Sequence, residues 1–120
     1  MSYRSFEEVW QDIRKLEGKE VFTLCKCHKN HIVKVDETGL RTHPNGSEYA
    51  HPVTKGAFKT VWRKLIEDGE FVPVEDGGYY FACACIAHLP EVEYSCKDGL
   101  CLYLRQQNTH LFCEVKEHTE

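Results

Sequence analysis

The sequence predicts a single α+β domain with about three helices and small antiparallel β meanders. Two segments show the apolar spacing of amphipathic helices, and shorter apolar runs bounded by turn residues are typical of strands. The chain has 120 residues, of which 42% are hydrophobic and 28% charged, the balance of one globular domain. We therefore expect one domain over residues 1–120, with a helix-rich part at 5–90 and a β meander at 91–116.

The first helix is expected over roughly residues 5–17. Ser5 and Glu8 form a capping-box pattern, in which each side chain can bond the backbone N–H of the other residue. Gly18 then supplies a C-terminal stop. The residues expected on the apolar face are Phe6, Val9, Trp10, Ile13 and Leu16.

A small antiparallel meander is predicted after this helix. Two strands are expected at 20–26 and 31–36, joined by a polar turn. A second turn at 36–39 leads into a short strand at 40–42, and the Pro-Asn-Gly run at 44–46 then interrupts the chain.

The second helix is expected to begin after Thr54, a good N-cap residue, and to end at Asp68 and Gly69. Its spacing places one apolar stripe against the core. The residues of that stripe are Phe58, Val61, Trp62, Leu65 and Ile66.

The third helix is less sharply defined by the sequence. Residues 79–89 contain a run of small residues that favours a buried helix ending before Pro90, although their alternation also fits a strand. A short strand is expected before it at 71–74, and Pro73 indicates that this strand is an edge. The strands of the C-terminal meander are expected at 92–97, 100–105 and 109–115.

Four basic residues are concentrated on the second helix, although the net charge of the chain is −4. Lys55, Lys59 and Arg63 recur at every fourth position, and Lys64 lies beside them. A helix with an apolar back and a basic front can dock on a core and meet DNA phosphates, with Thr60 near the base edges. A solvated helix face is the competing interpretation.

The order of elements, a helix, a helix with a basic front and then a β segment, is that of a winged helix. The chain resembles the winged-helix-like module that precedes nuclease domains in some prokaryotic restriction-type endonucleases, over roughly residues 5–90. That resemblance implies a winged-helix-like fold and a role in DNA binding, with catalysis located in the following nuclease domain. No nuclease motif is found in this sequence. The positions that carry the resemblance are Leu16 to Lys19, Thr23, the turn from Asp36 to Gly39, Phe58, Leu65, Asp68, Gly69, Ala82, Ala87, Leu89 and Pro90.

Cys25, Cys27, His28 and His31 place four potential zinc ligands in one hairpin. Zinc accepts Cys and His in a tetrahedral set, so these residues are the candidate metal site. Their spacing lacks the two residues that normally separate paired cysteines in a zinc knuckle. Buried thiols and exposed turn histidines are the alternative.

Two further pairs of cysteines are expected to pack in the core or to face each other across a hairpin. Cys83 and Cys85 are expected to pack as small buried thiols, although Cys85 could contact His88 one helical turn away. With the Asp-Gly turn at 98–99, Cys96 would face Cys101 across a hairpin. That pair could form a disulfide, share a metal or remain as two free thiols.

These patterns together favour a non-enzymatic DNA-binding or regulatory module. No Gly-rich phosphate loop, Ser/His/Asp set or metalloprotease motif occurs in the sequence. The alternative is a protein-interaction or adaptor domain, zinc-stabilised or metal-free, which would use Tyr49, Tyr79 and Tyr103. The first ten residues carry no apolar signal segment, so a cytoplasmic location is expected, with no membrane partner.

Overall fold

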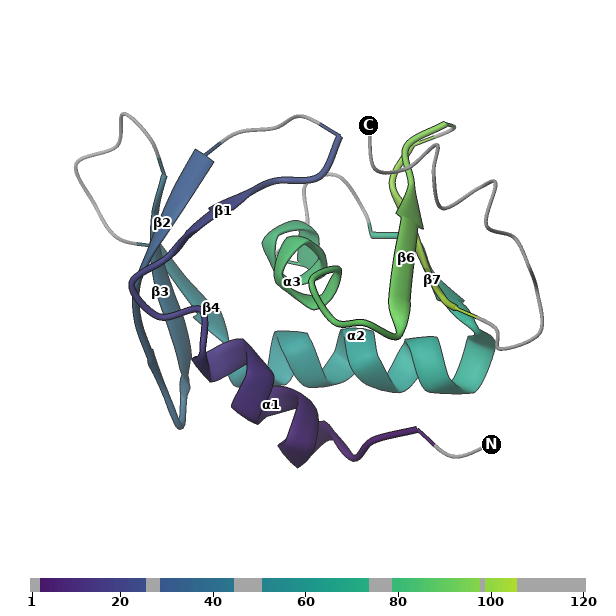
Figure 1. Ribbon diagram of the computed structural model, residues 1–120, viewed down its shortest axis with the longest axis horizontal. Helices are drawn as coiled ribbons and strands as arrows, with labels where there is room; N and C mark the ends of the chain where they lie inside the picture. Colours follow the sequence, from purple (N-terminus) through teal and green to yellow (C-terminus); the bar gives the residue numbers. More distant parts are fainter. Residues whose placement is uncertain (1–2, 26–28, 45–50, 74–78, 98, 106–120) are drawn as a thin grey trace.

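The computed structural model describes residues 3–25, 29–44, 51–73, 79–97 and 99–105. Helix α2 (Lys55–Asp68) runs along one side of the molecule, and a β-sheet stands near each of its ends (Figure 1). Helix α3 (Tyr79–Ile86) lies between the two sheets, and α1 (Phe6–Arg14) packs against α2. The predicted α+β class with three helices and small antiparallel sheets is confirmed.

Both amphipathic helices begin where the sequence predicts. Ser5 Oγ accepts a hydrogen bond from the Glu8 backbone N–H at 3.3 Å, and Glu8 Oε1 accepts one from the Ser5 N–H at 2.9 Å. Thr54 caps α2 in the same way, through a 3.2 Å bond from the N–H of Ala57. Gly69 closes α2 in the left-handed conformation, with φ of 82°. These caps satisfy N–H groups that a helix leaves unpaired in its first turn.

The first sheet has four antiparallel strands in sequence order. Buried and exposed residues largely alternate along its strands, as expected when one face of an antiparallel sheet covers the core. A bulge between Ile32 and Lys34 shifts the register of the second and third strands. The strands are β1 (Glu20–Phe22), β2 (Lys29–Asp36), β3 (Gly39–Pro44) and β4 (His51–Thr54).

Strand β4 was not predicted, because Pro52 within a short polar run argues against a central strand. The structure places β4 at the edge of the sheet, beside β3. Pro52 opposes Arg41, and a proline is tolerated in an edge strand because its missing N–H can face away from the ladder. Strand β1 is also shorter than the predicted segment 20–26.

The second sheet joins β5 (Glu70–Phe71), β7 (Cys101–Leu104) and β6 (Val92–Ser95), with β7 in the middle. The edge position of the strand near Pro73 is therefore confirmed, although that strand ends at Phe71. The predicted strand at 109–115 lies outside the described residues. Helix α3 is confirmed over 79–86, and a short turn continues to Leu89.

One cluster of buried side chains contains residues from both the helix-rich part and the C-terminal meander. Trp10, Phe58 and Leu102 are fully buried within it. Arg4 adds a polar link: its guanidinium binds Asp12 at 2.8 Å and Glu91 at 2.7 Å, and its carbonyl accepts from Trp62 Nε1. The inclusion of Ile66 in the apolar stripe of α2 was wrong, because this side chain is 39% exposed beyond the edge of the stripe.

The finer winged-helix prediction stays a prediction. In a winged helix the recognition helix directly precedes the wing strands and is exposed. Here α3 precedes the β6–β7 hairpin, and five consecutive residues of α3, from Ala82 to Ile86, are buried. The outer side of α2, in contrast, is exposed.

Candidate nucleic-acid interface

The outer side of α2 carries three of the predicted DNA contacts. Lys59, Arg63 and Lys64 are exposed, whereas Thr60 is half-buried. None of the three cations forms an ion pair with another residue that the structure describes. The stripe of Phe58, Val61, Trp62 and Leu65 is buried on the opposite side and fixes the orientation of the helix. These cations are thus available to a phosphate ligand.

Lys55 differs from the other basic residues of α2. Its Nζ lies 3.6 Å from a carboxylate oxygen of Glu7 and 3.5 Å from one of Glu37, and 5.5 Å from the centre of the Trp10 ring. A cation in the first turn opposes the helix dipole, and the two carboxylates offset this cost. The side chain of Lys55 is only 21% exposed. Lys55 therefore belongs to the packing of α1 against α2 and not to the group of exposed cations on α2.

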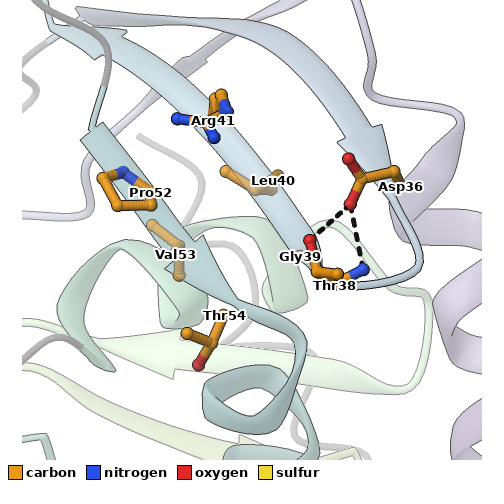
Figure 2. A pocket seen from close by; sticks show the side chains of 8 residues that line it. All are labelled: Asp36, Thr38, Gly39, Leu40, Arg41, Pro52, Val53 and Thr54. Atoms are coloured by element: carbon orange, nitrogen blue, oxygen red, sulfur yellow. Dashed lines mark hydrogen bonds between the residues drawn. The ribbon is translucent and has the colours of Figure 1, made fainter.

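A shallow pocket of about 150 Å³ lies where the β2–β3 turn meets the end of β4 (Figure 2). Asp36 Oδ1 accepts hydrogen bonds from the Thr38 N–H at 2.9 Å and from the Thr38 hydroxyl at 2.7 Å. These bonds hold the pKa of the Asp36 carboxyl below its ordinary value. The Asp36 carboxylate is thus engaged within its own turn. Its lining residues are Asp36, Thr38, Gly39, Leu40, Arg41, Pro52, Val53 and Thr54.

The predicted zinc site is not assembled as expected. Cys25 forms a disulfide with Cys96, so it has no thiolate to offer to a metal. His31 lies on the exposed side of β2, opposite Glu20 and His43. Cys27 and His28 lie outside the described residues. Within the described part of the chain, no group of three or more His, Cys, Asp or Glu residues is placed to hold a metal ion.

The predicted pairing of Cys96 with Cys101 was wrong. Cys101 opposes Ser95 in the β6–β7 ladder, one residue away from the expected register, and its thiol is free. Cys96 therefore lies beyond the ladder, where it reaches Cys25 at a Cα–Cα distance of 5.6 Å. Cys83 and Cys85 are buried thiols in α3, as predicted.

The tyrosines proposed for an adaptor surface are less accessible than expected. Tyr79 is half-buried with its ring against Phe71 at a centroid distance of 5.8 Å, and Tyr103 is half-buried in β7. Tyr49 lies outside the described residues. Across the described ranges, no helix has the length and apolar character needed to span a membrane.

A second group of cations, which the sequence pattern did not indicate, lies on the four-stranded sheet. Lys29, Lys34 and Arg41 share its outer face, because the strand register places them on the side opposite the buried residues. The alternation of β2 could have indicated this face, but the bulge at Val33 breaks the alternation before Lys34.

Comparison of the chain with protein-family models, with curated proteins and with solved structures finds no match. The resemblance to the module of restriction-type endonucleases therefore stays a prediction, and the function rests on the geometry described above.

Proposed function

We propose that this protein is a non-enzymatic DNA-binding module and that the exposed side of α2 contacts the phosphates of duplex DNA. The observation that carries the proposal is the set of three exposed cations, Lys59, Arg63 and Lys64, without ion-pair partners among the described residues. Phosphate contacts of this kind supply most of the affinity in non-specific DNA binding.

The distribution of charge limits how strong this binding can be. Glu67 and Asp68 follow the cations on the exposed end of α2, and the whole chain carries a net charge of −4. We therefore expect weak, strongly salt-dependent binding. For three phosphate contacts on duplex DNA, the logarithm of the binding constant should decrease linearly with the logarithm of the salt concentration, with a slope of about −2.7.

The first prediction concerns charge reversal on α2. The double variant Lys59→Glu/Arg63→Glu should lower the affinity for a generic duplex about tenfold or more at low salt and should flatten the salt slope to about −0.9. Fluorescence anisotropy with a labelled duplex measures both quantities, and circular dichroism checks that the variant is folded.

The matched control is Lys19→Glu/Lys97→Glu, which makes the same change in net charge at two exposed positions off α2. It should retain most of the affinity. Undetectable binding by the wild-type protein at low salt, or an equal loss in the control, would rule out the α2 surface. The adaptor alternative stays a prediction, with a stable complex in size-exclusion chromatography as its test.

A further inference from the structure

The outer face of the four-stranded sheet is a second exposed surface, separate from the α2 surface to which the proposed function is assigned. Two rows of paired residues cross it: Phe22 opposes Lys29, and Lys34 opposes Arg41. Along β2 the two rows are about 13 Å apart, at roughly 3.3 Å per residue with one bulged residue. The face therefore combines an aromatic ring with three cations on neighbouring strands.

The aromatic side chain on this face is accessible. Phe22 is 53% exposed, although its neighbour Val21 is buried on the other side of the strand. Bases of single-stranded nucleic acid stack on such rings, and this stacking tolerates any base because each base has a flat π face. The bases of a duplex are already stacked on one another and cannot use it. This feature favours a single strand over a duplex on the sheet.

Two cations on the face repel each other. Lys34 and Arg41 are direct partners across two strands, and like charges in this position destabilise a sheet. A bound phosphate backbone would remove the repulsion. Two carboxylates share this face: Glu20 lies 3.8 Å from Lys29, and Asp36 accepts two hydrogen bonds from Thr38. A phosphate at Lys29 must displace the Glu20 contact, which costs little because this ion pair is long and exposed to water.

We propose that this outer face binds single-stranded DNA, with a base stacked on Phe22 and phosphates at Lys29, Lys34 and Arg41. Three cations against the carboxylates of Glu20 and Asp36 leave the face with a net positive charge that complements a phosphate backbone. Its exposed ring distinguishes it from the α2 surface. The inference goes beyond the proposed duplex contact and can succeed or fail independently of it.

The test uses the full chain and a labelled oligothymidine of about 12 nucleotides, within the range bound by single-strand platforms. The wild-type protein should bind it at low salt with a slope near −2, as expected for three phosphates on a single strand. Phe22→Ala should weaken binding about tenfold. Lys34→Glu/Arg41→Glu should weaken binding at least as much. This variant replaces one like-charged pair across the strands with another, so the stability of the sheet should change little.

The controls separate this surface from the α2 surface. Lys19→Glu/Lys97→Glu should leave oligothymidine affinity within about threefold of the wild-type value, as expected for sites outside the contact. Lys59→Glu/Arg63→Glu should lower it by clearly less than the sheet variant does, because the aromatic rings of α2 are buried and cannot stack on a base. The proposal is overturned if the oligothymidine does not bind, or if the α2 variant loses as much affinity as the sheet variant. It also fails if Phe22→Ala binds normally, or if polyglutamate or the matching RNA binds about tenfold more tightly than the DNA strand.

Discussion

At the scale of single residues, the three free thiols that the structure describes differ in their access to water. Cys83 and Cys85 are fully buried in α3, whereas Cys101 is half-buried. Burial raises the pKa of the Cys83 thiol to about 12 and raises that of Cys85 as well. Only the thiolate is a good nucleophile, so a catalytic role for Cys85 with His88 has no chemical support in this environment.

We predict that alkylation of the folded protein follows this order of burial. Iodoacetamide at mildly alkaline pH should modify Cys101 before Cys83 and Cys85, because burial also raises the pKa of Cys101 but leaves part of its side chain accessible. Peptide mapping by mass spectrometry measures each site, and urea should expose all three. Early modification of Cys85 would contradict the burial of α3.

At the scale of elements, the junction of the β2–β3 turn with α2 depends on one glycine. Gly39 has φ of 148°, which side-chain-bearing residues rarely adopt, and a Cβ there would meet the backbone of Val53 and Lys55. The adjacent Thr38 carbonyl accepts a hydrogen bond from the Lys55 N–H at 2.9 Å. The turn and the start of α2 therefore pack backbone against backbone.

We expect Gly39→Ala to lower the free energy of unfolding by about 2 kcal/mol or more. Gly56→Ala is the matched control, because its Cβ would have only Thr54 Oγ1 nearby, at 3.8 Å, and alanine favours the helix by up to about 1 kcal/mol. Urea unfolding followed by tryptophan fluorescence measures both. Equal stability of the two variants would show that the close approach at Gly39 is absent.

The elements that the sequence predicted are those whose signals are local. The capping box at Ser5 and the stop at Gly69 depend on residues within one helical turn, and both are present. Strand β4 depends on pairing with β3, which its short polar sequence does not encode. The role of Lys55 likewise depends on carboxylates from two other elements, Glu7 and Glu37, and helix periodicity alone cannot reveal them.

At the scale of the whole molecule, the Cys25–Cys96 disulfide joins the turn after β1 to the residue that follows β6, across 71 residues of sequence. Tyr80 of α3 supports the same region by donating a hydrogen bond to the Leu24 carbonyl at 3.0 Å. This pair could not be predicted from the sequence, because a spacing pattern does not show which distant segments lie side by side. A cytoplasmic location stays a prediction, and reducing conditions there would open this bond.

The last prediction is that opening this bond destabilises the fold without abolishing it. Closing a loop of this length contributes about 4 kcal/mol in the chain-entropy account, an upper value because unfolded chains retain some structure. Cys25→Ser/Cys96→Ser should therefore unfold at lower urea concentration than the oxidised wild-type protein and should match the wild-type protein under reductant. Cys101→Ser should keep the oxidised midpoint. Non-reducing peptide mapping provides the direct check, because a Cys96–Cys101 linkage in the folded protein would contradict the β6–β7 register on which this pairing depends.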